Sequence, residues 1–443
     1  MVAELPNSVT PGETKSDMTG SGVSETVLEG VFPNSWYTEP AFYDFERRAI
    51  FSKRWLLTTH RLRLAEPGRY LRFDMAGFDF FLIKNKAGEI KAFHNICRHR
   101  AYPLIDKDQP DQGKKQIIAC GYHGWAFNLD GKLAKAPNFD ETKDFNKDDY
   151  SLFAIHTHVD KSGFVWVNFD SSKTPMPWEE LNAGTDEQQR LQDFPLDSYV
   201  HHRTWTTNGK YNWKLVGDNY NEVMLPLQGK PPRHRQDHQL GPIFRRGANG
   251  RLEHFPPNRD DIKPEDFEYF GNGAFTYNYP NTAINLSTPY FYIMRVIPTG
   301  PTTVTTEYQT FRNPASDMDI FQRAADFFEG IELEDYDLMN GVQKNLNAGV
   351  YVQGPLHTKR EGGVLYFKSL IQADLKKHMA IETEVGGRQV WPAKRSQQLH
   401  KDVVEQEQFC SAVCACAVAQ RQAQQPMNIV PMGNANNETE IKA

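Results

Sequence analysis

Two short stretches of sequence, Cys97-Arg-His99 and Cys120-Gly-Tyr-His123-Gly-Trp125, decide how this chain is interpreted. The first stretch supplies a Cys-x-His pair and the second a Cys-x-x-His pair, and twenty residues lie between them. Thiolate sulfur and imidazole nitrogen are ligands that proteins offer to zinc and to iron. Two cysteines and two histidines in this arrangement predict a metal centre held by two loops.

The mixed Cys/His spacing separates two kinds of metal centre. A structural Cys₂His₂ zinc site usually takes its ligands as a Cys-x-x-Cys pair and a separate pair of histidines. A Rieske [2Fe–2S] cluster holds one iron by two cysteines and the other by two histidines. Because imidazole is neutral, this cluster accepts an electron more readily than an all-cysteine cluster, at about −150 to +300 mV. We therefore interpret Cys97, His99, Cys120 and His123 as ligands of a Rieske [2Fe–2S] cluster, with zinc as the alternative.

The composition is that of a globular protein in a reducing compartment. The 443 residues are 39% hydrophobic and 12% aromatic, which is enough for two domains with cores of their own. No apolar run reaches the length of a membrane-spanning helix. A net charge of −6 gives no basic surface for nucleic acid. Five cysteines, two of them already assigned, do not suit a disulfide framework. We expect a cytoplasmic protein without nucleic-acid or membrane partners.

Composition and the period of the apolar residues divide the chain into four parts. The first thirty-odd residues are rich in Ser, Thr, Gly and Pro, and their acidic residues do not suit a targeting peptide. After Trp391 the composition changes to Gln, Ala and Asn. The expected parts are a disordered N-terminal tail (1–35), a Rieske domain with a preceding helix (36–170), a catalytic domain (171–395) and a polar, low-complexity C-terminal tail (396–443).

The periodicity predicts an α+β fold, made of a small all-β domain and a larger domain with an antiparallel sheet flanked by helices. In the small domain, strands are expected at 70–73, 80–83 and 164–169, after a helix near 46–55. A long helix is expected from about Asp317 to Leu346. Strand-like segments of the larger domain recur at 200–207, 273–279, 284–298 and 302–312.

The order of the motifs resembles a known family. The Rieske motif is followed by Asn212-Trp213-Lys214 and then by Asp218-Asn219-Tyr220-Asn221-Glu222. This order is similar to the large (alpha) subunit of Rieske non-haem iron oxygenases, and within them to the choline monooxygenase and carnitine oxygenase branch. The stretch from Glu334 to Leu346 resembles the helix that carries a carboxylate ligand in that branch. The resemblance covers about residues 36–395.

The resemblance implies a chain of redox centres. In the family, a ferredoxin or a flavin reductase reduces the cluster, and electrons pass to a mononuclear Fe(II). Two histidines and a carboxylate hold that iron and leave positions open for O₂. The resemblance implies that Asp335 is the carboxylate ligand and that Glu222 bridges cluster and iron between neighbouring subunits of a homotrimer. The alternative for Asp335 is a solvated acid on an exposed helical turn, since other acidic residues surround it.

The chain departs from the family directly after Glu222. The family continues with Cys-Tyr-His-Cys, and a second His follows five residues after the first. Here the aligned positions are Leu225 and Lys230. Leucine has no donor atom and lysine is a cation at neutral pH, so neither can hold iron. As written, the mononuclear Fe(II) is therefore doubtful, because Asp335 alone would retain it poorly.

A reading frame displaced by one nucleotide restores the family pattern. The codon of Met224 is ATG, so a displaced codon begins TG and permits Cys, and the next codons permit Tyr, His and Cys. The codons of residues 230–235 permit Asn-His-Pro-Asp-Ile-Ala, which contains the second His. Val223 begins with GT, the letters that open an intron. We hypothesise a splice or sequencing error between Val223 and about Gly247.

The alternative to an oxygenase is an electron-transfer protein or pseudoenzyme that lacks the mononuclear iron.

Two further groups of residues have side chains that can bind a metal, but their sequence context does not predict a metal site. His234 and His238 stand four apart but follow Pro231-Pro232, without a convincing helix, and are interpreted as solvated. The tail cysteines lack a His or carboxylate partner and are interpreted as thiols without a metal. They are Cys410, Cys414 and Cys416. The remaining histidines without a partner at ligand spacing are interpreted as structural; they include His94, His254, His357 and His378.

The branch resemblance implies a small quaternary-ammonium substrate such as choline, carnitine or betaine, hydroxylated by insertion of one oxygen atom into a C–H bond. A quaternary ammonium has no hydrogen to donate, so aromatic faces usually recognise it through cation–π attraction. Segment 269–292 is rich in aromatic residues, although aromatic residues on strands are more often core. These residues are Tyr269, Phe270, Phe275, Tyr277, Tyr279, Tyr290, Phe291 and Tyr292.

Overall fold

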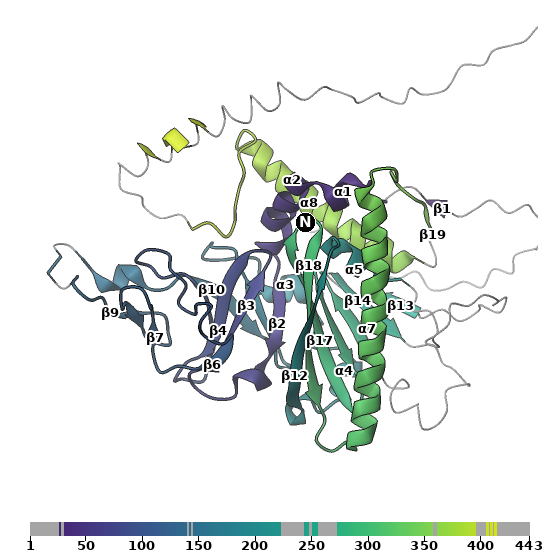
Figure 1. The fold of residues 1–443 in the computed structure, drawn as a ribbon, viewed down its shortest axis with the longest axis horizontal. Helices are drawn as coiled ribbons and strands as arrows, with labels where there is room; N and C mark the ends of the chain where they lie inside the picture. Colours follow the sequence, from purple (N-terminus) through teal and green to yellow (C-terminus); the bar gives the residue numbers. More distant parts are fainter. Residues whose placement is uncertain are drawn as a thin grey trace, which may run out of the picture. The chain divides into compact units, whose positions relative to one another are not determined.

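The computed structural model divides the chain into two compact units, Met1–Lys394 and Arg395–Ala443. All sheets lie in the first unit (Figure 1). Within the part of the chain that is described, no helix is long and apolar enough to cross a membrane. The described residues are 26–27, 31–139, 141–142, 145–222, 243–247, 250–255, 273–357, 361–395, 405–406, 408–410 and 412–413.

The Rieske part is built on a seven-stranded antiparallel sheet and a three-stranded sheet. Strands β3 and β4 join through Ala76 and Gly77, which both have positive φ, at 52° and 80°, as the tightest hairpin turns require. The large sheet has the order β2-β11-β10-β5-β4-β3-β6 and the small one β7-β8-β9. The strands are β2 Leu56–His60, β3 Arg69–Met75, β4 Phe78–Lys84, β5 Ile90–His94, β6 Gln112–Lys114, β7 Ile118–Ala119, β8 Ala126–Phe127, β9 Leu133–Lys135, β10 Ala154–Val159 and β11 Phe164–Asn168.

Alternate residues of the large sheet enter two different cores. On β4, Phe80 and Leu82 belong to a core that continues into the catalytic sheet and its helices. Phe81 and Ile83 belong to the core beneath the Cys/His loops, which also contains Cys97. The two faces are separated because successive side chains of a strand point to opposite sides. This period-2 pattern confirms the all-β domain and places the predicted metal centre on one face.

The N-terminal helical segment begins earlier than its periodicity indicated. Helix α1 covers Ser35–Thr38 and α2 covers Pro40–Glu46, followed by the π-helical turn η1 at Arg47–Phe51. Proline at the first position of α2 fits the helix start, where its missing N–H costs nothing. Within the segment expected to be disordered, β1 (Thr26–Val27) pairs with β19 (Leu356–His357), a contact that no local pattern indicates.

The catalytic part is a second seven-stranded antiparallel sheet, with the order β12-β18-β17-β16-β15-β14-β13. The expected strand 284–298 is in fact two strands, because Ser287-Thr288-Pro289 forms a turn between β16 and β17. The strands are β12 Val200–Gly209, β13 Ile243–Arg246, β14 Arg251–Phe255, β15 Ala274–Asn278, β16 Thr282–Leu286, β17 Tyr290–Gly300 and β18 Thr303–Arg312.

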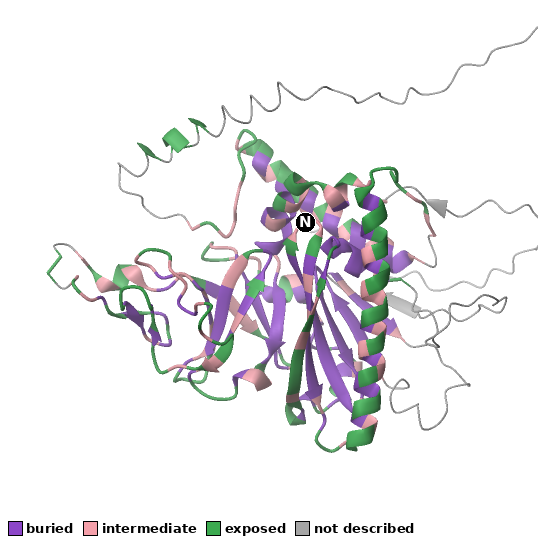
Figure 2. Cartoon of the chain, in the orientation of Figure 1, coloured by how far each residue is buried: buried purple, intermediate pink, exposed green. Residues whose placement is uncertain are grey.

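Three helices pack on this sheet, and its central strands are buried on both faces (Figure 2). They are α5 (Trp213–Tyr220), α7 (Met318–Asn347) and α8 (Gly362–Glu384). Helix α7 agrees with the helix expected from Asp317, and the Asp317 side chain caps it by accepting from two backbone N–H groups. Helix α8 was not predicted, and the two glycines that open it disfavour helix. The α+β class is confirmed.

The second unit, Arg395–Ala443, is described only in short stretches. The backbone is helical at 405–406, 408–410 and 412–413, in a tail that was expected to be disordered. The side chain of Cys410 is exposed. Cys414 and Cys416 lie outside the described residues.

Candidate metal centres

The four expected cluster ligands lie on two tight loops. The first loop follows β5, where the Cys97 N–H donates to the Tyr102 carbonyl at 2.9 Å and the Ala101 N–H donates to the Cys97 carbonyl at 3.0 Å. The second loop joins β7 to β8 and is closed by the Cys120 N–H, which donates to the Trp125 carbonyl at 2.8 Å. These bonds let each loop hold its ligands without a regular element.

The structure brings the four side chains together in like pairs. The Cys97 and Cys120 thiols hydrogen-bond to each other, and both residues are buried, at 2% and 4% exposure. The rings of His99 and His123 lie 4.6 Å apart between centroids. His99 is half-buried and His123 is exposed. The sulfur side of the centre is therefore enclosed, while the imidazole side faces outward.

These residues fit a Rieske cluster better than a single zinc ion. In the described ranges, no three His, Cys, Asp or Glu side chains are grouped to hold one metal ion. A two-iron cluster instead separates a cysteine pair from a histidine pair, which is the pairing found here. The buried Nδ1 of His99 also has no hydrogen-bond partner among the residues that the structure describes, as expected of a ligand nitrogen without its metal. The Trp125 ring stacks on His99 at 5.2 Å and 8° and restricts its orientation.

The pKa of the Cys97 thiol is raised to about 11, mainly by burial. The His99 backbone N–H lowers this pKa, and the hydrogen bond with Cys120 raises it. The same burial lowers the pKa of His99, as does the neighbouring His123. A buried thiolate needs a compensating positive charge. Iron supplies that charge when the cluster is bound, so the enclosed cysteine pair is suited to a metal and not to free thiolates.

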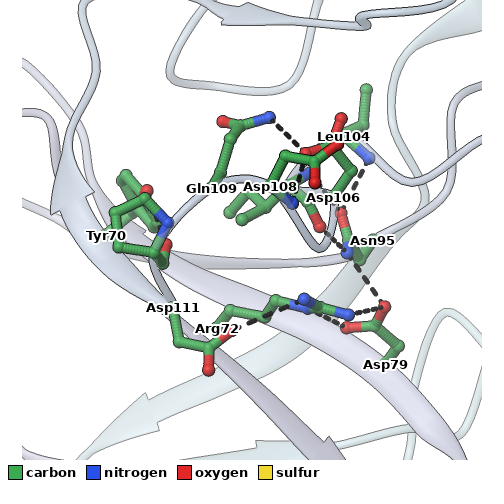
Figure 3. Close-up of polar contacts among 11 residues, drawn as sticks. Tyr70, Arg72, Asp79, Asn95, Leu104, Asp106, Asp108, Gln109 and Asp111 are labelled. Carbon is green, nitrogen blue, oxygen red and sulfur yellow. Dashed lines mark hydrogen bonds and ion pairs between the residues drawn. The ribbon is translucent and has the colours of Figure 1, made fainter.

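A polar network that the sequence did not reveal anchors the first loop (Figure 3). The side-chain oxygen (Oδ1) of Asn95 accepts hydrogen bonds from the backbone N–H groups of Leu104 and Ile105, at 2.9 and 2.8 Å. Its amide donates to the Ile105 carbonyl and to Asp79, at 2.8 and 2.9 Å, and Arg72 holds Asp79 through two bonds of 3.0 Å. Asn95 thus ties the two ends of the loop together. The only signal in the sequence was a polar residue two positions before Cys97, directly after a strand.

The Asn212-Trp213-Lys214 motif has a structural explanation. Asn212 caps α5, because its side-chain oxygen accepts from the Lys214 N–H at 3.0 Å. The Trp213 indole N–H and the Lys214 ammonium both donate to the carboxylate of Glu46 on α2, at 2.8 and 2.6 Å. The motif therefore fixes α5 against the N-terminal helices and does not itself supply a metal ligand.

Helix α5 is also fixed to α8. The Asp218 carboxylate accepts from the Tyr37 hydroxyl at 2.7 Å and pairs with Lys368 of α8 at 2.9 Å. Glu222 follows at the end of α5, and burial raises its pKa to about 7, with the charges of Asp218, Glu361 and Asp335 adding to the effect. Glu222 and Asp335 therefore lie near enough for their charges to interact.

Asp335 lies on α7, half-buried, and the Asn219 side chain hydrogen-bonds to its carboxylate. Burial raises its pKa. Its carboxylate is therefore not simply solvated on an exposed turn. Asn219 comes from α5, so the two elements that the resemblance connects with iron contact each other directly.

The residues present do not complete a mononuclear iron site. Asp335 would supply the carboxylate, but Leu225 and Lys230 provide no imidazole, whatever their conformation. Both lie outside the described residues, as do His234 and His238. His254 is buried, but its ring nitrogen lies 3.2 Å from the Asn221 side-chain oxygen. The chain as written therefore does not fit the family's iron centre.

Comparison with known proteins shows which domain families and which enzymes the chain resembles. Residues 54–146 match the Rieske [2Fe-2S] domain, and residues 232–376 match the catalytic domain of the ring-hydroxylating alpha subunit. The chloroplastic choline monooxygenase of Spinacia oleracea is 27% identical over 353 residues, 78% of each chain. The carnitine monooxygenase oxygenase subunit of Acinetobacter pittii is 28% identical over 367 residues, 77% of this chain and 93% of the relative.

The fold agrees with solved structures. The quaternary ammonium Rieske monooxygenase CntA, in complex with gamma-butyrobetaine, superimposes with a TM-score of 0.65 at 23% identity, over 78% of this chain and 95% of the other. A Rieske domain followed by a ring-hydroxylating catalytic domain defines the alpha subunit of a Rieske oxygenase. The chain belongs to this family of oxidoreductases, and the relatives that it resembles include choline and carnitine monooxygenases. The two domains imply a Rieske cluster and a mononuclear iron, and family members take electrons from a reductase or ferredoxin.

Proposed function

We propose that the gene encodes an oxygenase subunit that passes electrons from its Rieske cluster to a mononuclear iron and hydroxylates a small, choline-like quaternary ammonium compound. The observation that carries the proposal is the pairing of the four ligands, with the thiols buried together and the imidazoles together at the surface. The branch of the matched relatives, which include choline and carnitine monooxygenases, supports the substrate class.

We assign Cys97, His99, Cys120 and His123 to the cluster, Asp335 to the iron and Glu222 to the bridge between them. The outward imidazole side suits electron exchange across a subunit contact, and the two carboxylates near the junction of α5 and α7, the exposed Glu222 and the half-buried Asp335, suit the receiving end. A ferredoxin or flavin reductase is the proposed donor, and a homotrimer the proposed assembly. The proposed domain boundary near residue 170 falls between the two family matches.

A second candidate function follows from Leu225 and Lys230. As written, the chain is an electron-transfer protein or pseudoenzyme whose catalytic domain lacks mononuclear iron. The catalytic-domain match begins at residue 232, after the segment in which the family histidines are missing. A reading-frame error between Val223 and about Gly247 would account for the missing histidines, although the match already begins within that interval. Strand β13 starts at Ile243 and pairs with β14, so regular structure near the end of that interval is consistent with the hypothesis.

Two measurements separate the candidates. Sequencing of the transcript across codons 223–247 tests the frame, and a transcript that encodes these residues as written would end the error hypothesis. Iron analysis of purified protein tests the metal: cluster alone gives two irons per subunit, and a filled mononuclear site gives three. The chain read in the displaced frame should then consume O₂ in the presence of choline, carnitine or betaine. A restored, three-iron protein that ignores every quaternary amine would refute the substrate class.

A further inference from the structure

The Asp106 side chain lies between the two loops that carry the proposed cluster ligands, and it is half-buried. The Tyr102 hydroxyl, from the first loop, donates to its Oδ2 atom at 3.5 Å. A Cβ atom added to Gly121 would lie 3.6 Å from the same oxygen, and Gly121 directly follows Cys120 in the second loop. The carboxylate therefore lies against both loops, beside the residue that follows a proposed ligand.

Tyr102 connects this carboxylate with the sulfur side of the centre. The Tyr102 backbone carbonyl accepts from the Cys97 N–H at 2.9 Å, so Tyr102 is fixed to the first ligand. The charge of Asp106 is the main cause that raises the pKa of the Tyr102 hydroxyl, and the charge of Cys120 adds to this rise. Both charges act on one hydroxyl group, so Asp106 lies in the same electrostatic environment as the buried cysteine pair.

The other contacts of the Asp106 carboxylate are also with neutral groups, as Figure 3 shows for two of them. Its Oδ1 atom accepts from the Asp108 backbone N–H at 3.2 Å and from the Gln109 side-chain amide at 3.4 Å. The Lys115 ammonium donates to the Gln109 amide oxygen at 2.5 Å, so a neutral amide lies between it and Asp106. These contacts orient the carboxylate and leave its negative charge in place.

A negative charge at this position opposes reduction of the cluster. Reduction takes one electron from the proposed ferredoxin or flavin reductase and adds one negative charge to the centre, which a fixed carboxylate repels. Net charge and hydrogen bonds to the sulfur atoms are among the factors that set the reduction potential of an iron–sulfur cluster. Because Asp106 is half-buried, salt screens this repulsion less than it screens the repulsion between two exposed charges.

We propose that the Asp106 carboxylate lowers the reduction potential of the Rieske cluster, and that Tyr102, Gln109 and the Asp108 backbone hold it in place for this role. A lower potential makes the reduced cluster a stronger donor to its electron acceptor, and it demands a more strongly reducing partner as the electron source. The proposal rests on the four ligands assigned under the proposed function and deepens it by naming a residue that sets the redox step. It needs neither the mononuclear iron nor a quaternary amine.

Redox titration of the full chain with its cluster, followed by the circular dichroism of the cluster, tests this without turnover. Asp106→Asn keeps a side-chain oxygen that accepts from the Asp108 N–H but removes the charge. At an applied potential near the native midpoint, this variant should raise the ratio of reduced to oxidised cluster at least about threefold, or about 28 mV at about 59 mV per tenfold for one electron. Equal ratios in the two proteins, at full cluster content, would overturn the proposal.

Two further variants separate charge from shape. Asp106→Glu restores the charge on a longer side chain and should stay within about twofold of the native ratio. Asp111→Asn removes an exposed carboxylate from the same connection between β5 and β6, where Asp111 pairs with Arg72 at 3.4 Å (Figure 3), and should also stay within about twofold. A shift in either variant as large as that in Asp106→Asn would overturn the assignment of the effect to the charge of Asp106.

Iron and acid-labile sulfide, with the electron paramagnetic resonance spectrum of the reduced protein, show whether each variant holds an intact cluster. If Asp106→Asn does not, Asp106→Ser replaces it, because a serine hydroxyl can also accept from a backbone N–H two residues on. Asp106→Ser should raise the ratio in the same direction. Loss of the cluster from both variants would show that Asp106 holds the loops together, and would overturn its role in setting the potential.

The outcomes distinguish this proposal from the function itself. An unchanged potential in cluster-loaded Asp106→Asn would overturn the role of Asp106 and leave the proposed oxygenase intact. A corrected chain that ignores every quaternary amine would refute the substrate class, and the shift in Asp106→Asn would still support the role of Asp106. A native chain without iron and acid-labile sulfide would overturn both, because both depend on the cluster.

Discussion

At the scale of single residues, buried charges hold the catalytic helices in place. Glu46 and Lys214 form an ion pair of 2.6 Å with no exposed side-chain surface, and the Trp213 indole donates to the same carboxylate at 2.8 Å. Burial raises the pKa of Glu46 and lowers that of Lys214, and each partner opposes the shift of the other. Because both charges are enclosed, each depends on the other for compensation.

Replacing both partners of this pair should therefore cost less stability than the two single replacements added together. We expect Glu46→Gln to lower the free energy of unfolding by about 3 kcal/mol or more, because the Lys214 charge stays buried and uncompensated. The double variant Glu46→Gln/Lys214→Met should lose less than the sum of the two single variants. Denaturant unfolding measures this. The exposed pair of Arg61 and Asp197 is the control, and Asp197→Asn should change stability by less than about 1 kcal/mol. Strict additivity at Glu46 and Lys214 would contradict the argument.

His60 links the two sheets and should make stability depend on pH. Its ring nitrogen lies 2.8 Å from the Ser162 carbonyl, and its ring packs against Phe164, Phe291 and Phe311. Burial lowers the pKa of His60 to about 4. Above pH 6.5 both the folded and the unfolded chain hold it neutral. Below pH 6.5 only the unfolded chain takes up the proton, so stability falls toward pH 4, by at most about 1.4 kcal/mol per pH unit.

Unfolding midpoints measured from pH 7.5 to 4.5 test this slope. His60→Gln should flatten it, although not completely, because burial also lowers the pKa of His201 and of His254 to about 4. The exposed His123 imidazole is a proposed cluster ligand, so cluster content must be followed in the same samples. A slope that is unchanged in His60→Gln would show that His60 is not the group responsible.

At the scale of elements, the first ligand loop depends on a side chain outside the metal centre. Asn95 makes four hydrogen bonds, three of which connect the start of the loop with backbone groups at Leu104 and Ile105. Unsatisfied buried backbone groups cost about 1–3 kcal/mol each. Asn95 therefore holds the loop that carries Cys97 and His99 in one conformation, and this conformation fixes the positions of the two proposed ligands.

We expect Asn95→Ala to lose cluster as well as stability, because the loop can then move its two ligands apart. Iron and acid-labile sulfide per subunit, together with visible absorbance, measure the loss, which should exceed about half of the cluster in purified protein. Asn85→Ala is a matched control: Asn85 is also buried and bonds the Glu89 N–H at 2.8 Å, but in the turn before β5. That variant should lose stability and keep its cluster. Equal cluster content in both variants would refute the anchoring role.

At the scale of the whole molecule, the imidazole side of the proposed cluster faces outward. Electron transfer from the cluster to a neighbouring subunit is therefore a testable proposal. We propose that the electron acceptor belongs to a neighbouring subunit. In the corrected chain, Cys97→Ser should abolish the cluster and Asp335→Ala the mononuclear iron, so each variant alone should be inactive.

Mixed assemblies of the two variants, made by co-expression, should recover part of the O₂ uptake, because an intact cluster on one subunit then faces an intact iron on the next. Variants purified separately and mixed without subunit exchange are the control and should stay inactive. Co-expressed assemblies that remain inactive, although both chains are shown to be present, would indicate transfer within one subunit.

The local pattern of the sequence was enough for the metal chemistry and for several of the longer strands, whereas β2, β5, β10, β13 and β14 were not predicted. Ligand type and spacing define the Cys/His centre because the two pairs lie within a few residues of each other. Alternation predicted β3, β4 and β12, and the 3.6-residue period predicted α7. The helix α8 was missed because its two opening glycines disfavour helix, and its stability comes from packing of Phe367 and Ile371 in the core.

Tertiary structure alone decided which side chains meet. On β17, Tyr290 and Tyr292 face α7 while Phe291 packs toward the Rieske part, a division that composition cannot show. Trp205, Tyr308 and Glu332 are far apart in the sequence and converge only because β12 and β18 pair beneath α7. The sequence by itself determined the redox chemistry, since a ligand's donor atom is a property of its residue type. Only the folded chain determined that Glu332 is buried against Tyr292 and Tyr308, because these contacts join distant elements.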